Sequence, residues 1–147
     1  MSAVTIKNLQ DIKVGDVAWF AKTVTEADVM MFAMLSGDYA NHHVDITFAA
    51  TTVFKTRIAH GMLTAGLICP VLTQLCGDGS VTYSQEIKFK SAVLLNDTVT
   101  VRGEVVELLP EQNQVKIDVV CTKQGHREGD RPLVLGSFIQ SLVVLKD

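Results

Sequence analysis

Two short polar pieces of the sequence hold the side chains best suited to acid–base chemistry. Residues 36–45 read SGDYANHHVD and place Asp38 five positions before His43. Residues 57–62 read RIAHGM and place a histidine directly before Gly61. Carboxylates and imidazoles are the side chains that most often exchange protons with a reacting group. We therefore predict that the two pieces contribute to one acid–base site.

Addition of water to a double bond beside a thioester is a reaction that such a site can perform. It needs a base that takes a proton from water and an acid that gives a proton to the α-carbon. It also needs a hydrogen-bond donor that stabilises the negative charge that builds on the thioester oxygen. Asp38 and His43 can form the acid–base pair. The backbone N–H of Gly61, at the expected start of a helix, is free to donate, and the absent side chain lets a substrate come close.

Each candidate residue also has a plainer interpretation. Asp38 could simply complete a turn, since Asp is common in turns. Asp45 is better explained as the N-cap of the next helix. His42 is expected to be a solvated loop residue, and His60 could be a buried histidine that orders the loop. No metal site is predicted, because adjacent histidines in a loop do not readily bind one ion and no HxxxH spacing occurs.

The elements that must position these residues change character halfway along the chain. The first half carries helix signals, and the second half carries the alternating pattern of strands. Thr25 is a preferred N-cap and Gly37 a preferred stop, so a helix is expected between them. Residues 38–45 are too polar for either element and are predicted to form a loop. The expected elements are a strand over 16–23, helices over 26–36, 46–54 and 58–75, and strands over 81–90, 98–109, 114–123 and 133–145, with a charged loop over 125–131.

The helix expected over residues 58–75 is apolar nearly all round, which indicates that other structure surrounds it. Pro70 removes one backbone donor, so we expect a kink or a late start. Short turns between the later strands favour an antiparallel meander. One buried helix with such a sheet predicts a single α+β domain over residues 1–147, with one face of the sheet on the helix. Exposed edge strands are usually paired or covered, so a dimer is predicted.

Composition disfavours several classes of protein. With 48% hydrophobic residues and a net charge of −3, the chain can form a core and is not expected to be disordered. The absence of a basic patch or a Lys/Arg-rich helix disfavours a nucleic-acid or membrane partner. Cys69, Cys76 and Cys121 form no CxxC pair, and Cys69 and Cys76 are expected to be buried and inert. The polar start has no apolar signal segment, so a reducing, cytoplasmic location is expected.

Residues 32–63, FAMLSGDYANHHVDITFAATTVFKTRIAHGML, resemble the signature of the (R)-specific enoyl-CoA hydratases and MaoC-like dehydratases. The family pattern reads ser-gly-asp, any residue, asn-pro, any residue, his, any residue, asp. Asp38, His43 and Asp45 fall on its asp, his and asp positions. Residues 60–63, HGML, match a later his-gly-met-leu element. A weaker similarity continues to the chain end through KFKSAVLLNDTV.

The resemblance implies a hot-dog fold, in which an antiparallel sheet wraps around a long central helix, and a homodimer or a larger assembly of dimers. It implies that Asp38 and His43 activate the water and that the Gly61 amide donates to the thioester oxygen. His60 would belong to the same substrate-binding region.

The chain departs from the family pattern in the catalytic loop and in the long helix. The family's asparagine position is Ala40 and its proline position is Asn41. We expect Asn41 to take over the asparagine's part in holding the water and the loop. A serine common in characterised hydratases is Cys69 here. These changes bear on rate and substrate more than on reaction class.

The leading hypothesis is a lyase that hydrates 2-enoyl-CoA thioesters to (R)-3-hydroxyacyl-CoA and catalyses the reverse dehydration. It implies no metal or redox cofactor, and coenzyme A enters only as part of the substrate. One alternative is a hot-dog acyl thioesterase, which the loop pattern disfavours because thioesterases place their carboxylates differently. Another is a subunit that binds an acyl thioester without turnover, which the change to Ala40 leaves open.

Overall fold

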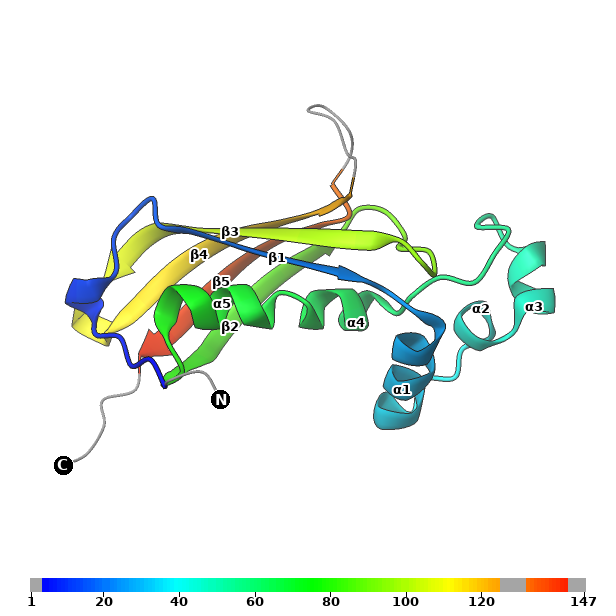
Figure 1. Ribbon diagram of the computed structural model, residues 1–147, viewed down its shortest axis with the longest axis horizontal. Coiled ribbons are helices and arrows are strands. Elements are labelled where there is room, and N and C mark those ends of the chain that lie inside the picture. The colour runs from blue at the N-terminus through cyan, green and yellow to red at the C-terminus, as the bar shows by residue number, and fades with distance from the viewer. Residues whose placement is uncertain (1–3, 125–131, 143–147) are drawn as a thin grey trace.

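The computed structural model describes residues 4–124 and 132–142. Figure 1 shows a sheet lying over a broken helix, and a group of short helices that extends beyond one end of the sheet. The charged loop expected over 125–131, and the end of the last expected strand, lie outside the described residues. Within the described ranges, every helix is too short or too polar to cross a membrane.

The described residues form a five-stranded antiparallel sheet. Its strands are β1 (Val17–Thr23), β2 (Ser80–Phe89), β3 (Thr98–Leu109), β4 (Gln114–Lys123) and β5 (Val134–Leu142), in the spatial order β1-β3-β4-β5-β2. Strands β3, β4 and β5 form the expected meander. However, β2 pairs with β5 and not with β3, so the prediction of a simple meander is wrong for β2. Alternation of polar and apolar residues determines the buried face of a strand, and it leaves the neighbouring strand open.

Helix α1 (Glu26–Ser36) begins and ends where the sequence predicts. The Thr25 hydroxyl accepts from the Asp28 N–H at 3.3 Å, and the Asp28 carboxylate accepts from the Thr25 N–H at 2.8 Å. That backbone bond, together with the Lys22 ammonium 2.9 Å away, lowers the pKa of Asp28 to about 2. Gly37 ends the helix with a φ of +77°, a conformation that residues with a side chain rarely adopt. The start of the polar segment is therefore well determined.

The polar segment contains a short helix, α2 (Asn41–Val44), so the prediction of an open loop is wrong there. Helix α3 (Ile46–Thr51) follows at once. The Asp45 carboxylate caps α3 by accepting from the Thr47 and Phe48 N–H groups at 2.8 and 3.0 Å. The N-cap interpretation of Asp45 is confirmed. Because this cap fixes the chain direction after α2, one helical turn can form even in a polar segment.

The expected long helix is divided into α4 (Gly61–Gly66) and α5 (Cys69–Cys76). Pro70 is the second residue of α5, and the predicted disturbance around it is confirmed. Proline has no N–H to donate to the carbonyl one turn earlier, so the ladder of helical bonds stops before it. The first helical residue is Gly61, three positions later than expected.

Helix α5 packs on the inner face of the sheet, against β1, β3 and β5 (Figure 1). The closest approach to β3 is at Gly103, where a Cβ atom would lie 2.5 Å from Cγ1 of Val71. The helix can lie this close because residue 103 has no side chain. The core on both sides of this contact is mostly aliphatic and includes Val71, Leu72 and Leu75 of α5 with Val99, Val101, Val105, Val115, Ile117 and Val119 of the sheet.

All three cysteines are free. Cys76 and Cys121 are buried, and burial raises their pKa to about 11 and about 12, so their thiols stay protonated and inert. Cys69 is exposed, and the expectation that it is buried is wrong. The break between α4 and α5 changes which residues of this stretch face the sheet.

The close contact at Gly103 yields a test of the fold. Gly103→Ala should destabilise the protein by about 1–3 kcal/mol, because the new methyl group overlaps Val71 and α5 must move. Gly66→Ala is the matched control, since a Cβ there meets nothing within 4 Å. It should leave stability unchanged or raise it slightly, because Ala is the better helix former. Urea unfolding measures both, and equal midpoints for the two variants would contradict this packing.

Candidate functional site

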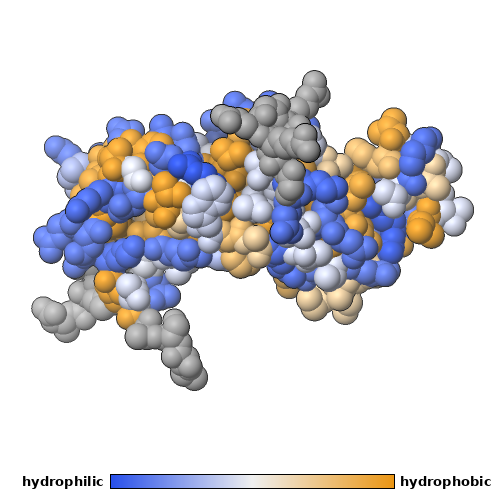
Figure 2. Space-filling model, turned by 45° about the horizontal axis from the view of Figure 1, so that its top comes forward, coloured by the Kyte–Doolittle hydropathy of each residue, from blue (hydrophilic) through white to orange (hydrophobic). Residues whose placement is uncertain are grey.

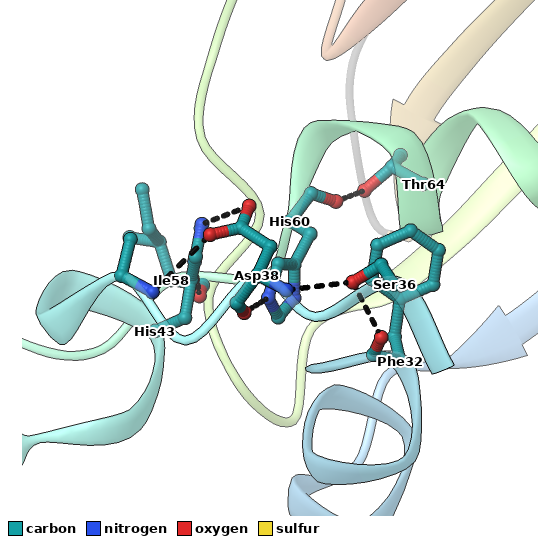
Figure 3. Close-up of polar contacts among 8 residues, drawn as sticks. Phe32, Ser36, Asp38, His43, Ile58, His60 and Thr64 are labelled. Carbon is teal, nitrogen blue, oxygen red and sulfur yellow. Dashed lines mark hydrogen bonds and ion pairs between the residues drawn. The ribbon is translucent and has the colours of Figure 1, made fainter. Parts of the chain in front are cut away.

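Asp38, His43 and His60 meet where the short helices join the broken helix (Figure 3). One side-chain nitrogen or oxygen from each lies within 4.8 Å of the others. They come from the turn after α1, from α2 and from the residue before α4. The two polar pieces of the sequence thus lie side by side in the structure.

His43 is buried, and its hydrogen bond determines which nitrogen carries the proton. Its Nδ1 lies 2.8 Å from the carbonyl oxygen of Ile58. A carbonyl oxygen only accepts, so Nδ1 carries the hydrogen. In the neutral ring, Nε2 then keeps its lone pair and lies 4.0 Å from Oδ2 of Asp38. His43 is therefore oriented to accept a proton on the side of the carboxylate.

The surroundings of His43 favour its uncharged form. Burial is the main cause that lowers its pKa below the ordinary value of 6.5. The bond to the Ile58 carbonyl acts in the opposite direction, while the neighbouring His60 and His42 lower the pKa further. The carboxylate of Asp38 raises it by a smaller amount. The net shift is downward, so an unprotonated base is available at neutral pH.

Asp38 is held by its backbone while one carboxylate oxygen stays open. Its N–H donates to Oγ of Ser36 at 3.2 Å, and its carbonyl accepts from Nε2 of His60 at 2.9 Å. Oδ1 accepts from the Ala40 N–H at 3.2 Å. Oδ2 faces His43, and the side chain is 53% exposed. The carboxylate is thus fixed in place and accessible.

The gap between Asp38 and His43 fits a water molecule. The carboxylate and the unprotonated Nε2 are both acceptors, and 4.0 Å is too long for a hydrogen bond between them. A water beside both can donate one hydrogen to each. Its oxygen then directs a lone pair outward, which is the orientation a nucleophile needs.

Gly61 opens onto a pocket of about 470 Å³, a volume within the usual range for small-molecule sites. The pocket is also lined by His43, Thr64 and Phe89. Gly61 is the first residue of α4, and its N–H donates to no acceptor among the described residues. A Cβ at this position would lie 3.1 Å from the Phe89 ring. A side chain at this position would crowd Phe89, so glycine suits the place where the unpaired N–H lies on the wall of the pocket.

His60 is fully buried behind the pair, with its ring stacked on His43 at a centroid distance of 3.8 Å and an angle of 27°. His42 does not behave as a solvated loop residue, and that expectation is wrong. It is half-buried, lines the pocket and lies 4.0 Å from His43 between ring centroids. Asn41 is exposed, and its side chain bonds to no residue in the described ranges, so its role stays a prediction.

Pocket residues beyond the two polar pieces could not be recognised in the sequence. Phe89 lies at the end of β2, and Val134 begins β5, yet both line the same pocket. Their apolar side chains follow the strand pattern and carry no chemical signal of their own. Only the pairing of β2 with β5 brings them to the site.

Asp38, His43 and His60 are also close enough to be considered as ligands of one metal ion. A histidine binds a metal in the plane of its ring, along a nitrogen lone pair. The rings of His43 and His60 stack nearly parallel, so their lone pairs do not converge on one point. Moreover, Nε2 of His60 is already bonded to the Asp38 carbonyl. The arrangement suits proton transfer better than metal binding.

The lowered pKa of His43 predicts how stability depends on pH. Unfolded His43 takes up a proton near pH 6.5 and the folded side chain only at lower pH, so the unfolded state binds more protons in this window. The stability linked to His43 is thus present above pH 6.5 and is lost as the pH falls below it, by at most about 1.4 kcal/mol per pH unit. Urea unfolding at pH 7.5 and 5.5 should show a larger loss in wild type than in His43→Asn. An equal loss in both proteins would refute the assignment.

Comparison with known proteins identifies relatives that share most of this chain. The family model described as MaoC like domain matches residues 13–128. An (R)-specific enoyl-CoA hydratase of Rhodospirillum rubrum is 49% identical over 117 residues, which cover 79% of this chain and 81% of that protein. A 3-hydroxybutyryl-CoA dehydratase of Methylorubrum extorquens is 42% identical over 114 residues, covering 77% and 73%.

Solved structures agree with the sequence relatives. The (R)-hydratase from A. caviae involved in PHA biosynthesis superposes with a TM-score of 0.84 at 36% identity, over 91% of this chain and 99% of that one. An R-hydratase from Pseudomonas aeruginosa gives a TM-score of 0.82 at 32% identity, over 95% and 92%. The expected hot-dog fold is confirmed, and the chain belongs to the MaoC-like family.

Proposed function

We propose that the protein is a lyase that adds water to a 2-enoyl-CoA, giving the (R)-3-hydroxyacyl-CoA, and that it catalyses the reverse dehydration. The observation that carries the proposal is the gap between Oδ2 of Asp38 and the unprotonated Nε2 of His43, beside a pocket with the free N–H of Gly61. Relatives at 49% and 42% identity are named for the two directions of this type of reaction, which supports it.

The proposed mechanism moves one proton through the pair. Asp38 and His43 hold the water, and one of them takes a proton as the water oxygen bonds to the β-carbon. The double-bond electrons shift toward the thioester, where the Gly61 N–H stabilises the charge on the oxygen. The proton is then delivered to the α-carbon, so the pair returns to its starting state. Asn41, exposed at the start of α2, is proposed to help hold the water or the substrate.

No metal or redox cofactor belongs to this proposal, because proton transfer and one backbone donor suffice for the reaction. Coenzyme A enters only as part of the substrate. We also propose that the protein acts in the cytoplasm, since its three free cysteines suit a reducing compartment.

The first test follows the loss of enoyl-thioester absorbance with crotonyl-CoA. Asp38→Asn and His43→Asn should each lower kcat by about 10²–10⁴-fold, the usual contribution of a general acid or base. Asp45→Asn is the matched control: it also falls on an acidic position of the family pattern, but it caps α3, and Asn caps a helix equally well. Activity should survive dialysis against EDTA.

The same assay with a thiol reagent separates hydration from thioester hydrolysis. Release of free coenzyme A in step with the absorbance change would establish a thioesterase instead. Binding of crotonyl-CoA and of longer 2-enoyl-CoA thioesters without turnover by wild type would establish a non-catalytic binding subunit. Full activity in either Asp38→Asn or His43→Asn would contradict the assigned pair.

We further propose that two copies of the chain join through β2. Among the residues that the structure describes, this strand is hydrogen-bonded to β5 on one side and to no strand on the other, and most of its residues are exposed on both faces. Val81, Tyr83 and Phe89 are 55%, 72% and 50% exposed. Figure 2 shows apolar residues at the surface over both halves of the molecule. A second copy of β2, related by a two-fold axis, would continue the sheet and cover this edge.

Light scattering on size-exclusion fractions tests the dimer. Wild type should have twice the mass of the chain, and a Val81→Glu, Tyr83→Glu double variant should shift toward the monomer, because like charges would meet across the axis. Trp19→Glu is the matched control, since Trp19 is 57% exposed on β1, at the opposite edge of the sheet. A monomeric wild type would argue against pairing through β2. Dissociation of the dimer in Trp19→Glu but not in the β2 double variant would argue against it as well.

A further inference from the structure

We propose that His60, which contacts no reacting atom, positions the acid–base pair. Its Nε2–H donates to the Asp38 carbonyl, and the face of its ring packs on the ring of His43. This inference rests on the proposed function. His60 directly precedes Gly61 and is the N-cap residue of α4. One residue thus contacts the backbone of Asp38 and the ring of His43 and directly precedes the backbone donor, Gly61.

The first link is a directed hydrogen bond. Nε2 of His60 lies 2.9 Å from the carbonyl oxygen of Asp38. The carbonyl can only accept, so Nε2 carries the hydrogen. The other bonds of this turn, to Ser36 and Ala40, lie at the exposed surface and join near neighbours in the chain. The bond to His60 spans 22 positions and ties the turn to the start of α4. Without it, the carboxylate would no longer be held against His43.

The second link is the stack of the two imidazole rings. Their centroids are 3.8 Å apart, and the Phe32 ring lies 4.9 Å from His60. Nδ1 of His60 is buried and has no hydrogen-bond partner among the described residues. The stacked His60 ring therefore shields one face of His43 from solvent.

This stack also affects the charge of His43. The titratable groups that face His43 are Asp38 from the turn, His42 from α2 and His60 from the segment before α4. The His60 ring packs on the face of His43 and so contributes to the burial that is the main cause of the lowered pKa of His43. Removing the ring at position 60 should therefore expose His43 and raise its pKa.

Two substitutions separate the links. In His60→Gln the longer side chain can place an amide N–H near the position of Nε2, so the bond to Asp38 can be kept. In His60→Asn the shorter side chain reaches only the position of Nδ1, and the bond is lost. We expect His60→Asn to lower kcat on crotonyl-CoA by about 10²-fold with little change in KM, since a small misplacement of a catalytic group has effects of this size. His60→Gln should recover most of that loss.

A Phe32→Leu variant controls for loss of packing, because it disturbs a ring that contacts His60 and leaves the bond to Asp38 in place. It should lower the urea midpoint while kcat stays close to wild type. If kcat follows the midpoint across all three variants, His60 has only a structural role and the proposal is overturned. Equal losses of kcat in His60→Gln and His60→Asn would overturn it as well.

An NMR titration of the imidazole C–H signals gives a readout that needs no turnover. The signal of His43, assigned with His43→Asn, should titrate below pH 6.5 in wild type and at higher pH in both His60 variants. If wild type hydrates no 2-enoyl-CoA, the proposed function fails, and this titration alone decides the inference. An unchanged midpoint for His43 in His60→Asn would then overturn it.

Discussion

The hydrogen bond from Nδ1 of His43 to the carbonyl of Ile58 is the interaction on which the site depends. It places the ring proton on the far side of the imidazole and leaves Nε2 free toward Asp38. The N–H of Ile58 in turn donates to the carbonyl of His42 at 3.1 Å, so the two chain segments are joined by a pair of bonds. This pair orients the base and also holds α2 beside the segment that leads into α4.

The broken helix carries the other half of the site. Pro70 stops the helical ladder, which leaves α4 as a separate short helix whose first residue, Gly61, faces the pocket. Helix α5 stays pressed on the sheet because Gly103 allows its close approach. The sheet thus fixes α5, and α5 fixes α4. Strand β2 adds the ring of Phe89, which lies against Gly61 in the lining of the pocket.

The polar groups of the site differ sharply in exposure. Asp38 is half-exposed and can meet water and substrate, whereas His43 and His60 are buried. Nδ1 of His60 is buried and has no partner in the part of the chain that the structure describes, which carries an energetic cost. The fold tolerates this cost where the same ring holds the Asp38 backbone and shields His43. A single buried imidazole can therefore shield its neighbour from solvent, which lowers the pKa of that neighbour, and also keep the turn in place.

Local patterns in the sequence predicted the structural features that depend only on residues close together in the chain. The Thr25 and Asp45 caps, the stop at Gly37 and the strand boundaries follow from hydrogen bonds and alternation within a few residues. The spacing of Asp38 and His43 likewise predicted a pair that could meet within one turn of chain.

Features that depend on distant contacts could not be predicted in this way. The pairing of β2 with β5, the place of His42 in the pocket and the bond from His60 to Asp38 join residues far apart in the sequence. The tautomer of His43 depends on a carbonyl 15 positions away. Alternation and capping act over a few residues, whereas strand order and side-chain partners follow from how the whole core packs, and for these the tertiary structure was required.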